Sequence, residues 1–347
     1  MRTLVLLLCG LLAAGLVSAQ APPSLTTAPQ RVRLAPQFVP GQTYRYQMEY
    51  RTTTESHRTG LVQDPQAPAQ LEITWSALVR LEVLLAEPPA PDAVRLRATY
   101  EKSSATARSD IYDPEGASLA AQYSKLQGHS IECTRTADGK VSNFRGLQDL
   151  GLPRFDRGDP KAVAAVQDWL SQISSGVGGL AREVAPGESW SSEQPAAGAP
   201  LVGLVWRTES TYLRNEPCRP AVPSDDERCA VILTRLEMSQ PRFHRGQPRA
   251  VRDPTPEDYR ARGLRTAGTW SGSGESLTYI SLRTGWVVSS TQSGSEEMDV
   301  TVSSAEGETS VRYAGRVRSQ SQISLLPQAA APAPPPSTPR GGRSVSE

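Results

Sequence analysis

Few side chains in this chain have the types and spacing that chemistry requires. The three histidines, His57, His129 and His244, are far apart, and none has a second His or a Cys at the usual zinc-ligand spacing. A serine hydrolase would place Gly-x-Ser-x-Gly on a sharp strand-to-helix turn. The nearest runs, Ser271-Gly272-Ser273-Gly274 and residues 174–179, do not fit that pattern. We interpret the first as a turn that opens a strand and the second as the end of a helix.

Acidic residues form two clusters in the sequence, Asp225-Asp226-Glu227 and Glu296-Glu297 with Asp299. Neither has the glycine and distal glutamate of a calcium-binding loop, so both are predicted to be solvated. A glycosidase needs two carboxylates across a cleft, and no pair stands out. The chain also lacks a phosphate-binding glycine loop and a dinucleotide-binding fingerprint. We therefore predict no catalytic, metal-binding or cofactor-binding residues, no cofactor, and no enzymatic activity.

The N-terminus predicts export. Arg2 is followed by an apolar run from Leu4 to Val17, and Val17-Ser18-Ala19 supplies the small residues of a signal-peptide cleavage site. That run is too short for a membrane anchor, because a transmembrane helix needs about 20 apolar residues. No later stretch is long and apolar enough to be a transmembrane helix. We therefore predict removal of residues 1–19 and a mature protein in the periplasm or outside the cell.

Charge and composition limit the classes of partner that the protein could bind. Lys and Arg number 37 and Asp and Glu number 36, so removal of Arg2 with the signal peptide leaves equal numbers. This balance argues against nucleic acid or an anionic membrane surface as a partner. Lys is rare beside Arg, and Ala and Pro are frequent, which is typical of high-GC bacterial genes. Single arginines are therefore interpreted as solvated surface residues.

Three cysteines, Cys133, Cys218 and Cys229, lie beyond the predicted signal peptide. An exported protein meets an oxidising compartment, in which cysteine pairs close. Cys218 and Cys229 bracket a polar, Pro-broken loop between two strand-like runs. We predict a disulfide between them, which would stabilise the fold by about 3 kcal/mol. Cys133 shares a strand face with Ile131 and is predicted to be a buried, inert thiol.

Alternation of apolar and polar residues is the strongest structural signal. Every odd-numbered position from Leu71 to Leu85 is apolar, which predicts a half-buried strand and disfavours a helix. At about 3.3 Å per residue this strand is near 50 Å long, so it must twist or bend at a bulge. Similar patterns predict strands near 44–51, 94–100, 204–212, 232–238, 266–282, 286–291, 298–303 and 311–325.

Two stretches 146 residues apart share one pattern. Gly128 to Val141 is predicted to be a β-hairpin around Asp138-Gly139, whose two residues tolerate positive φ. Gly274 to Val287 repeats two Gly, one Ser and one Val at that offset. Pro40 to Tyr44 and Pro186 to Trp190 share the same offset. The chain is therefore predicted to contain two halves with one β plan.

Helices are predicted at three places. Residues 160–176 follow Asp159, a plausible N-cap, and carry one apolar stripe that would pack on a sheet. Ser118 to Leu126 suits a short helix. A capped short helix is predicted to start at Thr255-Pro256-Glu257-Asp258 and to end at Gly263.

The predicted fold class is mainly β, with a long antiparallel curved sheet or partial barrel made of two related halves and one or two helices packed on it. A flexible segment over 20–37 precedes a single β-rich domain over 38–326. Its halves, about 38–150 and 184–326, are joined by the helix at 160–176. The Pro-rich tail, 327–347, is predicted to be disordered.

Tryptophans are the candidates for a carbohydrate platform. Trp75, Trp206 and Trp270 lie on strand patterns, where core packing is the commoner outcome. Trp190 and Trp286 lie near turns of the repeated units and are the better candidates for an exposed rim.

Several short motifs occur in a familiar order. They are Leu126-Gln127-Gly128, Asp138 to Val141, Pro186 to Trp190 and Thr284 to Val287. In this order the chain resembles a group of exported bacterial β-rich proteins of unknown function, over most of its length after the signal peptide. The resemblance implies no catalytic residues. By fold-level analogy, a long antiparallel sheet with helices on one face is similar to half-barrel carriers of the lipoprotein-localisation type.

Function follows only in outline from these observations. The first hypothesis is a non-enzymatic envelope protein that binds a hydrophobic or lipid-like ligand, although no ligand-binding residues can be named. The second is a structural or interaction protein whose partner is another envelope protein. The third is an unrecognised hydrolase.

Overall fold

The computed structural model describes residues 31–61, 68–85, 93–110, 120–121, 123–136, 141–146, 183–196, 199–218, 227–239 and 253–327. These ranges are mostly strand and include the short helix α4 (Glu257–Ala261). Eleven antiparallel strands form the large sheet. They are β2 (Thr43–Gly60), β3 (Ala69–Leu84), β4 (Val94–Ser109), β5 (Ser130–Arg135), β6 (Val141–Arg145), β8 (Ser189–Pro195), β9 (Val205–Pro217), β10 (Arg228–Ser239), β11 (Leu264–Ser281), β12 (Val287–Ser304) and β13 (Ser310–Leu325).

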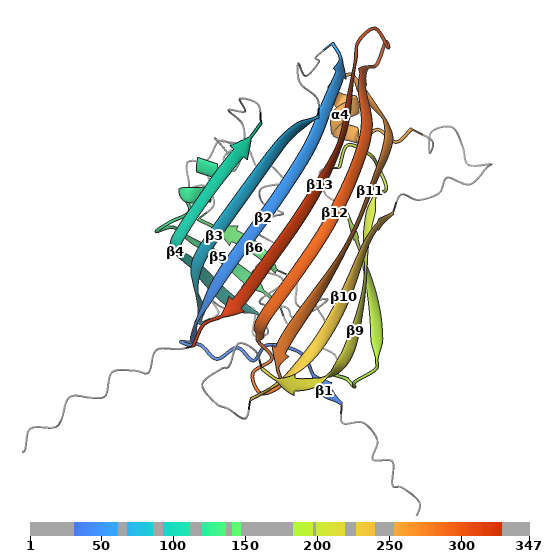
Figure 1. The fold of residues 1–347 in the computed structure, drawn as a ribbon. Coiled ribbons are helices and arrows are strands. Elements are labelled where there is room, and N and C mark those ends of the chain that lie inside the picture. The colour runs from blue at the N-terminus through green and yellow to red at the C-terminus, as the bar shows by residue number, and fades with distance from the viewer. Residues whose placement is uncertain are drawn as a thin grey trace, which may run out of the picture. The chain divides into compact units, whose positions relative to one another are not determined.

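The strands form two meanders that meet in the middle of the sheet (Figure 1). The order is β6-β5-β4-β3-β2-β13-β12-β11-β10-β9-β8, so sequence neighbours pair everywhere except where β2 meets β13. That contact runs from Val311 opposite Gly60 to Leu325 opposite Tyr46. The sheet is curved and open, with β6 and β8 as its edges. The predicted long antiparallel curved sheet is confirmed.

Both halves begin with the same turn. The amide of Gln42 donates to the carbonyl of Val39 at 3.1 Å, and the amide of Glu188 donates to the carbonyl of Ala185 at 3.0 Å. The glycines of these two Pro-Gly turns have φ values of +87° and +91°. A type II turn requires positive φ at that position, which explains why glycine occupies it in both halves.

The hairpins also match. β5 ends at Arg135 and β6 starts at Val141, whereas β11 ends at Ser281 and β12 starts at Val287. The offset between the two hairpins is the 146 residues seen in the sequence. The turns and hairpins of the two predicted halves therefore correspond at this offset, and β13 has no described counterpart in the first half.

Side chains alternate between two faces of the large sheet, which we call the buried face and the open face. In β3 the buried positions fall on alternate residues, in agreement with the predicted alternation. A slip of one residue in register would turn Val79 and Leu81 out of the core, where each now has no exposed surface. Burial of one such side chain stabilises the fold by about 1.5–3 kcal/mol. The largest cluster of the core contains Tyr46, Met48, Trp75, Ala77, Val79, Leu81, Val83, Leu96, Ala98, Tyr100, Leu126, Ile131, Cys133, Trp286 and Ile323.

The long strands bend at bulges, as their length requires. The register between β3 and β4 shifts between Leu78 and Val79, and that between β9 and β10 shifts between Val231 and Ile232. A bulge increases the local twist and turns the strand.

A segment that we call the N-terminal strap, residues 31–38, crosses the turn between β11 and β12. Its strand β1 (Val32–Arg33) pairs with β7 (Glu183–Val184) in a separate two-stranded sheet. The amide of Gln37 donates to the carbonyl of Thr284 at 2.8 Å, and the indole of Trp286 donates to the carbonyl of Gln37 at 3.2 Å. These contacts hold residues 31–37, which the sequence placed in a flexible segment.

Trp190 and Trp286, the better candidates for an exposed rim, are both buried. Trp286 has no exposed surface and Trp190 is 8% exposed. The ring of Phe38 packs edge-on against Trp286, with 5.1 Å between the ring centroids, and the ring of Tyr44 packs beside it. Trp286 does not form an exposed rim, because the N-terminal strap covers a turn that is distant in sequence.

Two local predictions need correction. The strands predicted at 286–291 and 298–303 are one strand, β12, which runs through Gly294 without a turn. Thr255 does not cap α4: the N-cap is Pro256, and no side chain bonds there. Instead the Thr255 hydroxyl accepts a hydrogen bond from the amide of Thr266 at 2.9 Å and fixes the loop to β11.

The remaining helix predictions have different outcomes. Ala120, Ala121, Tyr123 and Ser124 are helical, in agreement with the short helix predicted at 118–126. The helix predicted at 160–176 lies outside the described residues. None of the helices in the described part of the chain is long and apolar enough to cross a membrane.

Candidate functional site

The histidines lie apart in the fold. His57 is on the open face of β2, opposite Ala314 of β13, and lines a small groove of about 440 Å³. His129 lies in the turn before β5, where its ring contacts the carbonyl of Gln127 at 3.3 Å. His244 lies outside the described residues. Within the described ranges, no three His, Cys, Asp or Glu side chains are grouped in a way that could hold a metal ion.

The acidic cluster at Glu296, Glu297 and Asp299 is divided by the strand. Glu296 points to the buried face, where its carboxylate accepts a hydrogen bond from the indole of Trp270 at 3.1 Å. Glu297 and Asp299 point to the open face and pair with Arg316 and Arg312 on β13. Hydrogen bonds from Arg312 hold the pKa of Asp299 below its usual range. These carboxylates are therefore separate cross-strand partners.

Glu227 is the member of the other acidic cluster that the structure describes. It is 8% exposed, accepts a hydrogen bond from the hydroxyl of Ser281, and pairs with Arg283 at 2.9 Å. It lies beside the disulfide, because its carbonyl accepts a bond from the amide of Cys218 at 2.9 Å. The solvated loop predicted for this residue was wrong, since it ties β10 to the end of β11.

The predicted disulfide between Cys218 and Cys229 is present and buried. It closes the loop between β9 and β10. Cys133 is a free thiol with 1% of its surface exposed. Burial, with a smaller contribution from the charge of Glu132, raises the pKa of this thiol to about 12, so it stays protonated at neutral pH.

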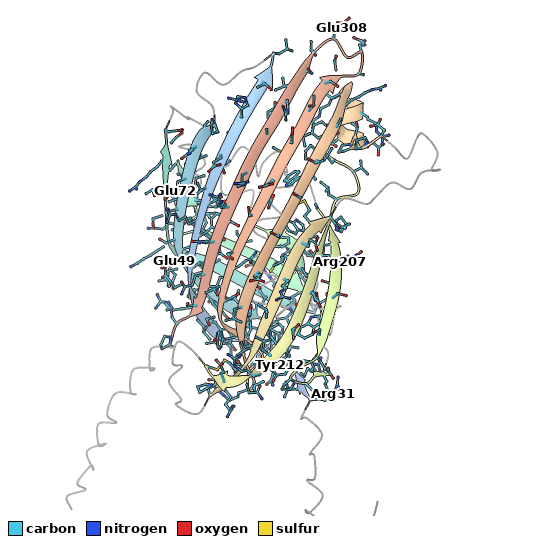
Figure 2. All side chains as sticks on the ribbon, turned by 45° about the vertical axis from the view of Figure 1, so that its right-hand side comes forward. Arg31, Glu49, Glu72, Arg207, Tyr212 and Glu308 are labelled. Atoms are coloured by element: carbon cyan, nitrogen blue, oxygen red, sulfur yellow. A yellow bond between two sulfur atoms is a disulfide. The ribbon has the colours of Figure 1, made fainter. Side chains whose placement is uncertain are left out.

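The open face carries a groove of about 1060 Å³ that crosses six neighbouring strands from β2 to β9. Its side chains fall in two register rows, and we call the groove that they form the polar groove. One row consists of Arg51, Gln320, Ser293, Glu275, Arg235 and Glu209. The other row consists of Thr53, Arg318, Ser295, Ser273, Glu237 and Arg207. Figure 2 labels Glu49 and Glu72 towards one flank of this face and Arg207 at the other.

Short side chains on β11 and β12 make the floor of the polar groove. Ser273, Ser293 and Ser295 occupy its centre, and Arg and Glu side chains surround them, including Glu275 of β11 and Glu297 of β12. Glycines alternate with these serines and face the buried side. A Cβ on Gly272 would lie 2.7 Å from the ring of Trp206, so glycine lets this ring pack directly under the floor.

Charge is balanced across the polar groove, whose lining includes four arginines and four glutamates. Arg235 lies 3.3 Å from Glu275, and both side chains are about two-thirds exposed, at 67% and 63%. Arg51 pairs with Glu72 at 3.1 Å just beyond the flank. Exposed pairs of this kind contribute little to stability, about 0–1 kcal/mol each. Their side chains are therefore free to rearrange around a ligand at small cost.

The hollow continues towards β3. A neighbouring groove of about 770 Å³ shares Arg51, Ser293 and Gln320 with the polar groove and adds Thr74 and Thr291. Two leucines, Leu233 and Leu277, also line it. The open face is thus hollowed over seven strands, from β3 to β9, and most of the residues that line it carry hydrogen-bonding side chains.

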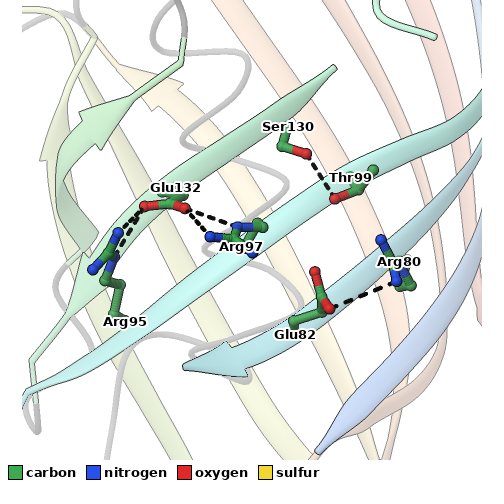
Figure 3. Close-up of polar contacts among 7 residues, drawn as sticks. All are labelled: Arg80, Glu82, Arg95, Arg97, Thr99, Ser130 and Glu132. Atoms are coloured by element: carbon green, nitrogen blue, oxygen red, sulfur yellow. Dashed lines mark hydrogen bonds and ion pairs between the residues drawn. The ribbon is translucent and has the colours of Figure 1, made fainter. Parts of the chain in front are cut away.

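A second polar cluster lies where β4 meets β5 (Figure 3). The carboxylate of Glu132 accepts hydrogen bonds from Nε of Arg95 at 2.9 Å and from Nε of Arg97 at 2.8 Å. Partial burial acts to raise the pKa of Glu132, but these bonds outweigh it and hold that pKa below its usual range. The cluster satisfies its own charges and joins the two strands.

Sequence reasoning missed the floor of the polar groove. Ser271-Gly272-Ser273-Gly274 was interpreted as a turn that opens a strand, but it lies in the middle of β11. The sequence did contain a pattern typical of a strand, because serine and glycine alternate there, with Ser271 and Ser273 on one face and the glycines on the other. Ser293 and Ser295 flank Gly294 in the same way on β12.

Comparison with known proteins gives no family. No family model matches the chain, and no curated protein matches it. An outer membrane channel from Pseudomonas putida F1 is 7% identical with a TM-score of 0.19, over 84% of this chain and 97% of that chain. OmpF of Salmonella typhi, in complex with daunomycin, is 7% identical with a TM-score of 0.17, over 81% of this chain and 97% of that chain. TM-scores this low carry no inference about function.

Proposed function

We propose that the protein is a non-catalytic binding protein of the bacterial cell envelope and that its ligand lies in the polar groove. The observation that carries this proposal is the contrast between the faces of the sheet. The buried face is filled by its own side chains around Tyr46, Leu81 and Trp286, which have no exposed surface. The open face is hollowed along two rows of polar residues.

The chemistry of the polar groove favours binding over catalysis. Among the described residues that line it, there is no His, Cys or Lys to act as a base or nucleophile. Its four glutamates lie among four arginines, and Glu275 and Arg235 form an ion pair across neighbouring strands. Rows of hydroxyl, amide, carboxylate and guanidinium groups suit recognition through many hydrogen bonds.

A hydrophobic or lipid-like ligand, the first hypothesis from the sequence, is less well supported than a polar one. Such a ligand needs a cavity lined mainly by apolar side chains. The core side chains of the buried face pack against one another in clusters. The export and envelope location that the sequence predicts remain part of the proposal.

Native mass spectrometry of the secreted, detergent-free protein tests the proposal. The protein would be incubated separately with the water-soluble and the organic-solvent-soluble fractions of a bacterial envelope extract. We expect an added mass from the water-soluble fraction. A Ser293→Trp variant, which fills the floor of the polar groove, should lose it, whereas Thr301→Trp, on the open face of β12 outside the groove, should keep it.

Other outcomes decide against the proposal. An added mass only from the organic fraction would restore the lipid-carrier hypothesis. No added mass from either fraction would favour a structural or interaction protein. Turnover of a component of the extract would favour the hydrolase.

A further inference from the structure

We infer that the ligand of the polar groove is a neutral, polyhydroxylated chain, which chemically is an uncharged glycan. This inference rests on the proposed function and adds the class of ligand. It follows from four properties of the groove: its serine hydroxyls are free, its charges balance, it presents side chains instead of backbone groups, and it is long.

The hydroxyl groups of the floor are available. Ser273, Ser293 and Ser295, with Ser271 beyond them, make no side-chain hydrogen bond to another described residue. In contrast, some hydroxyls on the buried face are paired with one another, as between Ser210 and Thr234 at 2.9 Å. Each free serine can donate one hydrogen bond and accept two, which matches the donor and acceptor capacity of a sugar hydroxyl.

Balanced charge disfavours ionic ligands. Four arginines and four glutamates line the groove, so an anionic polymer would meet as many repelling as attracting groups. The same holds for a cationic peptide. A neutral ligand avoids this conflict, and its hydroxyls can bond to both the guanidinium and the carboxylate of a pair such as Arg235 and Glu275.

The groove presents side chains and not backbone groups. An extended peptide binds a sheet chiefly at an edge, where unpaired backbone amides and carbonyls are available. β11 and β12 are central strands whose backbone groups pair on both sides. A glycan needs no such backbone pairing and can lie across the strands.

Length indicates a chain of several sugar units. Neighbouring strands are spaced at about 4.8 Å, so the five intervals from β2 to β9 span about 24 Å. Continuation of the hollow onto β3 adds one more interval. A single sugar would occupy only a small part of this length, so affinity should rise with the number of units.

Isothermal titration calorimetry on the intact secreted protein tests this inference. The probes are maltose, maltohexaose, cellohexaose, a neutral galactan fragment, an oligogalacturonate of equal length, and phosphatidylglycerol vesicles. We expect saturable binding of at least one neutral oligosaccharide, and if maltohexaose binds, it should bind at least 10-fold tighter than maltose. Affinity should change less than 2-fold between 50 and 500 mM salt, because no counterions are released.

Variants locate the binding. Ser293→Trp and, independently, Ser273→Trp should weaken binding at least 10-fold, whereas Thr301→Trp should leave it within 2-fold. Thermal unfolding of each variant checks that it is folded. Two floor variants are used so that the test still stands if one of them misfolds. Binding that persists in both folded floor variants would overturn the inference.

Two results separate this inference from the proposed function. If the water-soluble ligand found by native mass spectrometry is anionic or a peptide and is lost in Ser293→Trp, the glycan assignment is wrong but the polar groove remains the binding site. If every neutral oligosaccharide fails to bind at millimolar concentration, the glycan assignment also fails. If no water-soluble ligand is found at all, both proposals fail.

Discussion

Gly285 lies directly against Ala35. A Cβ on residue 285 would lie 1.9 Å from the carbonyl oxygen of Ala35. These residues are far apart in sequence, and their contact places the N-terminal strap over the turn between β11 and β12. Gly285 also has a φ of +71°, which side-chain-bearing residues rarely adopt. Glycine is therefore required at position 285 for two independent reasons, the close approach of Ala35 and the positive φ.

Gly285→Ala should destabilise the protein strongly. The positive φ alone costs about 1–2 kcal/mol for a residue with a Cβ, and the overlap with Ala35 must be relieved by lifting the strap from Trp286. We expect a total loss of about 3 kcal/mol or more, a fall typical of a disturbed core. Urea unfolding followed by Trp fluorescence measures it.

Gly41→Ala is the matched control. Gly41 has a φ of +87°, but nothing lies within 4 Å of the position of its Cβ. Only the conformational cost of about 1–2 kcal/mol applies. Equal losses in the two variants would show that the strap does not depend on the contact between Gly285 and Ala35.

Local patterns in the sequence predicted the strands well because burial alternates along them. The odd positions from Leu71 to Val83 predicted β3, and the Pro-Gly turns at Gly41 and Gly187 predicted where each half begins. Pairing of β2 with β13 was not predictable, because it joins strands from opposite ends of the domain and no local pattern encodes it. The burial of Trp286 was not predictable for the same reason, because the strap that covers it is distant in sequence.

The candidate site was missed because its residues resemble those of turns. Serine and glycine are typical of turns, so the run at Ser271 was interpreted as a turn that opens a strand, and Ser293 fell between two predicted strands. Long neighbouring strands on both sides hold these residues extended, and tertiary pairing overrides their weak strand preference. The groove itself arises only when the rows of six strands are brought into register.

Reduction of the disulfide should lower stability. In the chain-entropy model, a crosslink between Cys218 and Cys229, 11 residues apart, contributes about 3 kcal/mol. Thermal unfolding of a Cys218→Ala/Cys229→Ala variant should show a fall of several degrees relative to the wild type. Reductant should then have no further effect on the variant, and a further fall would show that the loss has another source.

Glu132→Gln should destabilise more than Glu275→Gln. Glu132 is 16% exposed and bonds to two arginines, whereas Glu275 is 63% exposed with one partner at 3.3 Å. Loss of the charge at Glu132 should cost about 1–2 kcal/mol at pH 7, and loss at Glu275 less than about 0.5 kcal/mol.

The effect of Glu132 should also depend on pH. In the folded protein its pKa is lowered from the usual 4.5. The ionised carboxylate therefore stabilises the fold fully above pH 4.5, and this stabilisation is lost as pH falls through the lowered pKa. Urea unfolding between pH 3 and 7 should show that wild type and Glu132→Gln converge at low pH. A constant difference across this range would rule out a contribution from the carboxylate charge.

Cys133 should make stability fall in alkaline solution. In the folded protein its pKa is about 12, above the usual 9.0. The protonated thiol therefore makes its full contribution to the free energy of unfolding below pH 9, and this contribution is lost as pH rises towards 12. Within this window the unfolded chain releases a proton that the folded chain keeps, which costs about 1.4 kcal/mol per pH unit. Cys133→Ala removes this proton, so its stability should fall less steeply than that of the wild type between pH 9 and 10. Urea unfolding at pH 8, 9 and 10 measures both slopes, and the buried tyrosines contribute equally to each protein. Identical slopes would mean that the thiol is solvated or already ionised, contrary to its position in the core.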